Sequence, residues 1–324
     1  MKRYVALGAS LLSLVFALVT AAHAGSPIII PVGSYPRSVV VNPVTNRVYV
    51  TNNGDTTVSV IDGSTNKVVA TVTVGLSPNG IDVDLETNTV YVANYNANSL
   101  SVIDGVTNTV KATIMALFQG SSYPWGVTVN SSTHKIFVSN SIGSEVAIID
   151  GTKNSLTRVQ VGKCPLGTAL NSSKNLIYVA NGCSGTISVL DGASGTVTNT
   201  FTLPNGAEPA AVAFDPVLDR LFVADSRNSV VYVLDASSGS LLNTITGGAQ
   251  RFGEPSDVAV LQSGKTVLVS DFLRNIVVEI NENTYAVESA LTGGSEPNGI
   301  AVNHATGNIY VVETNAFAVD VYSQ

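Results

Sequence analysis

Apolar and polar positions alternate along this chain in short β-branched runs that Asn, Gly, Asp and Ser interrupt. The stretch from Pro36 to Gly75 shows the pattern once in full, and it predicts strands at Ser38–Asn42, Arg47–Asn52, Thr57–Asp62 and Lys67–Val74. The chain then repeats this unit. A proline opens each repeat, at Pro36, Pro78, Pro124, Pro165, Pro209, Pro255 and Pro297. Repeats of 41 to 46 residues with four strands each are typical of β-propeller blades.

The two ends of the repeat array complement each other. The seventh repeat stops after its third strand, Ala318–Tyr322, while Pro27–Val32 matches the end of a fourth strand. Pairing these two segments closes the ring and leaves no exposed sheet edge at the junction. We therefore predict an all-β fold: a seven-bladed β-propeller of four-stranded antiparallel blades, the last closed by the N-terminal strand, as one domain over residues 25–324.

Two positions in each repeat carry further information. Sixteen residues after the proline comes an acidic or amide residue, at Asn52, Asn94, Asn140, Asn181, Asp225, Asp271 and Glu313. Two residues after the proline the side chain is small in six repeats and is Asp257 in the sixth. Small residues fit where inner strands crowd around an axis, so we expect Asp257 to lie near that axis.

Length changes are confined to the segments that connect one repeat to the next. In a propeller these connections gather around one mouth of the central channel. Loops on a rigid scaffold are where binding and catalytic residues are concentrated. We therefore expect the functional site at this mouth.

Residues 1–24 differ from the rest of the chain. Lys2 and Arg3 precede the apolar run Val5–Thr20, and Ala22-His23-Ala24 is a small-x-small cleavage pattern. This organisation predicts a signal peptide cleaved after Ala24; the alternative, an uncleaved anchor, has an apolar run that is short for a bilayer. We expect a secreted or periplasmic protein with no membrane span after cleavage.

The charge balance bears on the partner class. Only 12% of residues are charged and the formal net charge is −7; loss of Lys2 and Arg3 with the leader changes it to −9. Nucleic-acid binding depends on a basic surface, so nucleic acid is not the expected partner. A small molecule, a protein or a cell-envelope component remains open.

One tetrapeptide links the chain to a known family. Tyr49-Val50-Thr51-Asn52 resembles the signature of YVTN-repeat β-propellers, and variants follow at Tyr91–Asn94, Phe137–Asn140, Tyr178–Asn181, Phe222–Asp225, Leu268–Asp271 and Tyr310–Glu313. The resemblance covers nearly all of residues 25–324. It implies an exported seven-bladed propeller of the bacterial or archaeal type. The family includes surface-layer and periplasmic proteins, often without a known activity, and its signature residues are structural.

The two cysteines and the histidines suggest no catalytic or metal centre. Cys164 precedes the inner strand of the fourth repeat and Cys183 follows that repeat's second strand, so both are expected at one mouth. An exported chain favours a disulfide between them over free thiols or a metal role. His134 and His304 fall in turns at the opposite mouth and are interpreted as solvated turn residues. We predict no catalytic residue and no metal ligand among them.

Aromatic and charged residues at the variable mouth are the ligand-binding candidates. They are Trp125, Tyr95, Asp225, Asp271, Glu313, Asp257, Arg37, Arg227 and Arg274. Aromatic rings stack on ligands, and converging carboxylates with arginines bind polar ligands or Ca²⁺. The structural alternative is that the rings cover the loops and the carboxylates cap strand ends or form exposed ion pairs. No cofactor is predicted apart from this Ca²⁺ option.

The leading functional hypothesis is an exported, non-enzymatic propeller that binds a ligand or protein at the variable mouth. The resemblance also leaves open a lyase of the virginiamycin B type or a redox-cofactor enzyme at the same mouth. A lyase would need a metal or an acid/base pair there, and no histidine is expected at that position. A third alternative is a structural protein of the cell surface.

Overall fold

The computed structural model describes residues 26–323, apart from residues 116, 120, 121, 154, 205, 249, 250, 262–264 and 293. The predicted signal peptide, residues 1–24, lies outside the described residues. The strands predicted for the first repeat are confirmed, although the first begins at Pro36 rather than Ser38 and the fourth ends at Thr73 rather than Val74.

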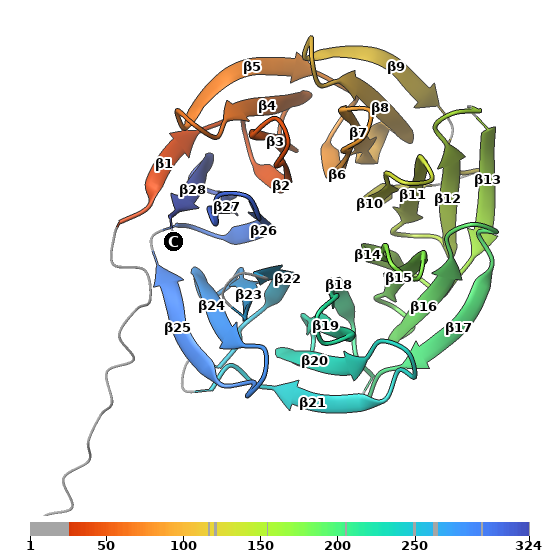
Figure 1. Cartoon of the computed structure of the whole chain (residues 1–324), viewed down its shortest axis with the longest axis vertical. Coiled ribbons are helices and arrows are strands. Elements are labelled where there is room, and N and C mark those ends of the chain that lie inside the picture. The colour runs from red at the N-terminus through yellow and green to blue at the C-terminus, as the bar shows by residue number, and fades with distance from the viewer. Residues whose placement is uncertain are drawn as a thin grey trace, which may run out of the picture.

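Seven four-stranded antiparallel sheets stand radially around a common centre (Figure 1). The inner strands are β2 (Pro36–Asn42), β6 (Pro78–Asp84), β10 (Pro124–Asn130), β14 (Pro165–Asn171), β18 (Pro209–Asp215), β22 (Pro255–Leu261) and β26 (Pro297–Val302). The second strands are β3 (Arg47–Asn52), β7 (Thr89–Asn94), β11 (Lys135–Asn140), β15 (Leu176–Asn181), β19 (Arg220–Asp225), β23 (Thr266–Asp271) and β27 (Ile309–Glu313). The blades are numbered one to seven from β2, and a 3₁₀ turn, η1 (Tyr95–Ala97), follows β7.

The outer half of each blade follows the same order. The third strands are β4 (Thr57–Asp62), β8 (Ser99–Asp104), β12 (Glu145–Asp150), β16 (Thr186–Asp191), β20 (Val230–Asp235), β24 (Ile276–Asn281) and β28 (Ala318–Tyr322). The outermost strands are β5 (Lys67–Thr73), β9 (Thr109–Met115), β13 (Ser155–Gln160), β17 (Val197–Thr202), β21 (Leu241–Ile245), β25 (Val287–Thr292) and, for the last blade, β1 (Ile28–Pro31).

The predicted ring closure is confirmed. β1 pairs antiparallel with β28, in a register that places Ile28 opposite Val321 and Ile30 opposite Val319. The last sheet therefore has the order β1-β28-β27-β26, and Figure 1 shows β1 beside β28 at the junction of the first and last blades. The N-terminal strand supplies the outer edge that the seventh repeat lacks.

The hydrophobic core consists of seven clusters, one between each pair of neighbouring blades. The second and third strands carry buried residues on both sides, because each blade packs against two others; in β3, for example, Val48 faces the last blade while Tyr49 faces the second. The outermost strands are largely exposed. Because both faces of the middle strands are buried, their sequences are continuous Val/Ile/Tyr runs and do not alternate between apolar and polar residues.

A polar clasp joins neighbouring blades at the mouth where the inner strands end. The Nδ2 atom of Asn42 donates to Oδ1 of Asn88 in the next blade at 2.8 Å. Blades three and four, and blades seven and one, are joined by the same type of Asn–Asn contact. Between blades two and three the clasp is Asp84 with His134. These clasps hold the ring together at the mouth opposite the variable connections.

Candidate functional site

The mouth at which the inner strands begin contains a cavity of about 310 Å³. In every blade the residue directly after the opening proline lines this cavity. These residues are Arg37, Asn79, Trp125, Leu166, Ala210, Ser256 and Asn298. Other lining residues include Ser226, Glu254 and Asp257. The variable connections surround the same mouth, so the predicted location of the site agrees with the position of the cavity.

A backbone irregularity directs this row of side chains inward. A register shift follows the opening proline in all seven inner strands, as between Pro36 and Val39. Such bulges bend a strand and re-aim its side chains. Asn79, Glu254 and Asn298 line the cavity without having been predicted from the sequence. The sequence signal that could have identified the residues directly after the prolines is their position: it follows a constant proline, yet its residue type varies among the repeats.

Arg37 and Trp125 meet across this cavity although they belong to blades one and three. The guanidinium carbon of Arg37 lies 4.7 Å from the centroid of the Trp125 ring, a cation–π distance. Tyr95 packs edge-on against Trp125, with ring centroids 5.7 Å apart, and stacks on Tyr123 at 4.5 Å. Burial lowers the pKa of Arg37 from its ordinary value, although the nearby Tyr95 and Glu254 oppose this shift. Three of the candidate residues therefore form one cluster at the mouth.

The floor of the cavity is built from small residues. A β-carbon on Gly80 would lie 2.1 Å from the carbonyl oxygen of Trp125, and one on Gly167 would lie 2.7 Å from the Cα of Ala211. Neighbouring inner strands thus approach too closely for side chains at these positions. This explains the row of small residues two positions after the proline.

Asp257 is the exception in that row, and it lines the cavity as predicted. Its Oδ1 accepts a hydrogen bond from the backbone N–H of Val258, and its Oδ2 accepts one from Ile300 in the last blade, both at 2.9 Å. Burial raises the pKa of Asp257 to about 6, while these two hydrogen bonds oppose the rise. The two hydrogen bonds fix the carboxylate in position.

The other three candidate carboxylates are not among the residues that line the cavity. Asp225 accepts hydrogen bonds from the backbone of Glu208 and Arg227, and Asp271 accepts them from Gly253 and Glu254. Both side chains are fully buried. They fasten the incoming connection to the second strand, as Asn52 does by accepting the N–H of Gly33. These contacts are structural, and ligand binding by the two carboxylates stays a prediction.

Glu313 occupies the same position in the last blade, where it meets a second acid. In blades one, two and four the equivalent Asn donates to a Ser seven residues later, at 2.9–3.0 Å. In the last blade these positions hold Glu313 and Asp320, which are 2% and 1% exposed. Burial raises the pKa of Glu313 to about 8, with a further contribution from the charge of Asp320, whose own pKa burial raises to about 6.

The remaining arginine candidates lie away from the cavity. Arg227 forms an ion pair with Glu208, and both side chains are well exposed. Arg274 donates its backbone N–H to Asp271. Neither arginine lines the cavity, so the structure brings only Arg37 of the three to the central mouth.

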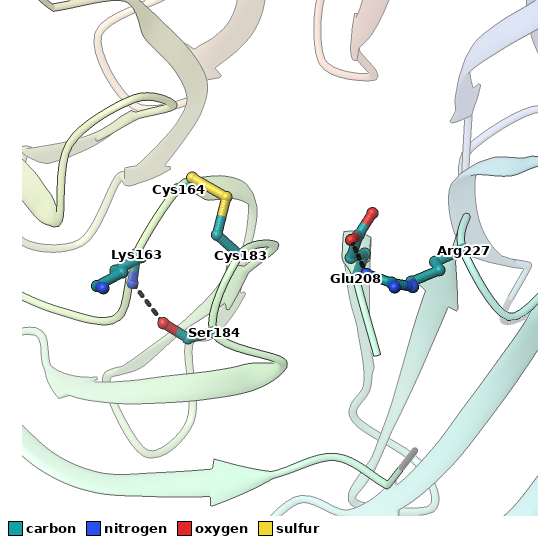
Figure 2. The surroundings of a disulfide bond; sticks show 6 residues. All are labelled: Lys163, Cys164, Cys183, Ser184, Glu208 and Arg227. Carbon is teal, nitrogen blue, oxygen red and sulfur yellow. Dashed lines mark hydrogen bonds and ion pairs between the residues drawn. A yellow bond between two sulfur atoms is a disulfide. The ribbon is translucent and has the colours of Figure 1, made fainter. Parts of the chain in front are cut away.

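The predicted disulfide is present. Cys164 and Cys183 are joined, with their Cα atoms 5.2 Å apart. Figure 2 shows this bond tying the connection before β14 to the turn after β15, beside the Lys163 N–H to Ser184 Oγ hydrogen bond of 2.7 Å, with the Glu208–Arg227 pair on the neighbouring blade. The bond stabilises the mouth of the fourth blade.

The described residues bear on the Ca²⁺ option and on the two histidines. No three His, Cys, Asp or Glu side chains among the described residues gather closely enough to hold a metal ion. The Ca²⁺ site stays a prediction of the sequence. His134 is not simply a solvated turn residue as expected, because its Nδ1 lies 2.7 Å from Oδ2 of the buried Asp84. It is a member of the interblade clasp at the far mouth.

Comparisons with known proteins identify the architecture. The family model described as YNCE-like beta-propeller matches residues 13–323. Comparison with curated proteins gives no significant match. Among the described residues, no helix is long and apolar enough to cross a bilayer.

Proposed function

We propose, from the premise that the chain belongs to the YNCE-like beta-propeller family, that it is an exported, non-enzymatic binding protein. Its ligand is a small molecule held in the central cavity between Arg37 and Asp257. One observation carries this proposal: the residues directly after the opening prolines converge on one cavity, and the side chains of two of them, Arg37 and Asn79, make no hydrogen bond to another described residue. Repeated structural positions in the same blades are apolar, glycine or backbone-bonded, whereas this row holds six different residue types over the seven blades, with Asn occurring twice.

The dimensions and lining are those of a ligand site. Binding pockets typically have volumes of roughly 300–1,000 Å³ and combine apolar walls with a few fixed polar groups. Leu166 and Ala210 supply one apolar wall, and Trp125 supplies an aromatic one. Asn79 is 3% exposed, and its side-chain amide makes no hydrogen bond to another described residue. Such groups are favourable only when a ligand or water completes their hydrogen bonding.

Export is the second part of the proposal. Its support is the leader-like organisation of residues 1–24 together with the Cys164–Cys183 disulfide, since disulfides persist in oxidising compartments. Expression of the full chain, followed by mass spectrometry of the mature N-terminus and of the fractionated protein, tests this part. Recovery of an unprocessed chain in the cytoplasm would contradict it.

The binding proposal is tested by thermal-shift screening of the purified mature protein against small polar and aromatic compounds, with CaCl₂ in the same screen. A ligand of the central cavity is expected to raise the Tm of the wild type and to lose its effect in Trp125→Leu/Asp257→Asn. The matched control is Arg227→Gln, which changes an exposed ion pair outside the cavity. A ligand whose effect survives the double substitution would remove the site assignment. Binding of a protein partner alone would replace the small-molecule assignment.

A further inference from the structure

One wall of the central cavity presents a positive charge whose hydrogen-bond donors are not used by any residue that the structure describes. The Arg37 guanidinium lies on the Trp125 ring. Among the described residues it makes no hydrogen bond or ion pair. Burial lowers its pKa, because the charge is partly removed from water. A guanidinium with unbonded N–H groups can bind a carboxylate, because its donors form a rigid planar fork that matches the two carboxylate oxygens.

Blade six contributes the opposite charge to the same cavity. Asp257 in β22 and Glu254 just before it both line the cavity. The charge of Glu254 influences the pKa of Arg37, yet no ion pair joins them within the described chain. Two hydrogen bonds hold Asp257 in place, and the backbone N–H of Glu254 donates to Asp271, which fixes the loop that carries it. Positive and negative groups therefore face one cavity without neutralising each other.

A ligand that carries both charges would satisfy both walls at once. We propose that the ligand is a small zwitterion, such as a free amino acid, with its carboxylate on Arg37 and its ammonium between Glu254 and Asp257. This inference rests on the proposed function of the cavity and specifies its ligand class. The apolar residues Leu166 and Ala210 provide the surface for an uncharged side chain.

Ligands with a single charge fit the arrangement less well. A simple anion would bind Arg37 but bring a further negative charge near Glu254 and Asp257. A simple cation would bind the carboxylates and leave the Arg37 donors unfilled. An unmatched charge in a partly dehydrated site carries a desolvation cost that a paired charge does not. The zwitterion avoids both penalties.

Isothermal titration at pH 7 with three compounds on one skeleton tests the inference. L-phenylalanine carries both charges, N-acetyl-L-phenylalanine only the negative one, and L-phenylalaninamide only the positive one. Since hydrogen bonds to charged groups contribute about 1.5–3 kcal/mol, the zwitterion should bind at least about tenfold more tightly than either blocked compound. L-leucine should show the same preference over its blocked forms.

Three variants test which side of the cavity binds the ligand's carboxylate and which side binds its ammonium. Arg37→Gln should reduce the preference for phenylalanine over phenylalaninamide, which lacks the carboxylate. Glu254→Gln and Asp257→Asn should each reduce the preference over N-acetylphenylalanine, which lacks the ammonium. Glu254→Gln keeps the test valid if Asp257→Asn folds poorly. Arg227→Gln is the control and should bind like the wild type.

The outcomes separate the inference from the function on which it rests. Equal binding of phenylalanine and either blocked compound would overturn the zwitterion and indicate a singly charged ligand. Absence of binding by all three, with another compound from the screen binding in a Trp125-dependent manner, would overturn the zwitterion while the binding function stands. Absence of any Trp125-dependent ligand would overturn both.

Discussion

The acid pair in the last blade should make the stability of the whole ring depend on pH. Glu313 and Asp320 stand where blades one, two and four hold hydrogen-bonded Asn and Ser. Oε2 of Glu313 and Oδ2 of Asp320 are buried and have no hydrogen-bond partner among the residues that the structure describes. Asp320 also lies opposite Ile29 in the strand pair that closes the ring. Replacing the pair with the repeat's own residues, Glu313→Asn with Asp320→Ser, is therefore expected to stabilise the protein.

The size of this effect on the free energy of unfolding follows from the raised pKa of Glu313. Its pKa is raised from 4.5 to about 8, so between these values the folded chain keeps a proton that the unfolded chain has released. Stability is then unaffected by this group below pH 4.5 and falls as pH rises towards 8, by about 1.4 kcal/mol per pH unit. At pH 7 the accumulated cost is roughly 3 kcal/mol. The Asn–Ser variant removes the titrating groups and with them this pH dependence.

Urea unfolding followed by circular dichroism at pH 5 and pH 8 provides the measurement. The wild type should be less stable at pH 8, and the Asn–Ser variant should gain most at that pH. Asn52→Glu with Ser59→Asp is the matched control, because it places the same acid pair in blade one and should introduce the same pH dependence. Equal wild-type stability at both pH values, or no gain at pH 8 in the Asn–Ser variant, would refute the reasoning.

Three further predictions concern the clasp, the disulfide and the cavity floor. The hydrogen bond to Asp84 raises the pKa of His134 above its ordinary 6.5, whereas partial desolvation lowers that of His304, although this turn residue is exposed. NMR titration should separate the two, and His134 should favour folding below pH 6.5 and lose this contribution as pH rises through its raised pKa. Replacing Cys164 and Cys183 with Ser should lower the unfolding free energy by about 3 kcal/mol, measured by urea titration against the oxidised wild type, and the reduced wild type should behave like the variant. Gly80→Ala should lower it by about 1–3 kcal/mol, because the new β-carbon meets the Trp125 carbonyl oxygen, while Ser38→Ala at the equivalent position of blade one should have little effect.

Each of these three predictions can fail on its own. Identical titration midpoints for His134 and His304 would contradict the clasp. Unchanged stability after loss of the disulfide would show that the connection before β14 is ordered without it. Wild-type stability of Gly80→Ala would mean that the inner strands of blades two and three can move apart.

Local patterns predicted most of the fold because propeller blades are made of local contacts. Each strand pairs with its neighbour in the chain, so strand boundaries, turns and repeat length are all recorded in short stretches of sequence. The closing strand was also predictable, since the last repeat lacks a fourth strand and Pro27–Val32 supplies one. The disulfide followed from two cysteines placed at one mouth of one blade.

Strand order predicts the mouth of the ring at which a residue lies, but not the direction in which its side chain points. The site was therefore predicted only in part. Asp225 and Asp257 were both expected at the variable mouth. The pleat turns Asp225 into its own blade, where backbone N–H groups bind it, whereas Asp257 reaches the cavity. Phe118, in the connection between β9 and β10, and Phe252, in the connection between β21 and β22, are buried in interblade clusters.

The sequence by itself determined the number of blades and their strand order, because those features depend on neighbouring segments. It also determined the way the ring closes, because the strand that the last repeat lacks is present before the first repeat. Only the tertiary structure decided that Arg37 of the first blade stacks on Trp125 of the third, and that Glu254 and Asp257 of the sixth face the same cavity. These residues meet through the curvature of the ring and the bulge after each proline. Both are geometric properties of the assembled blades, and no single repeat contains them.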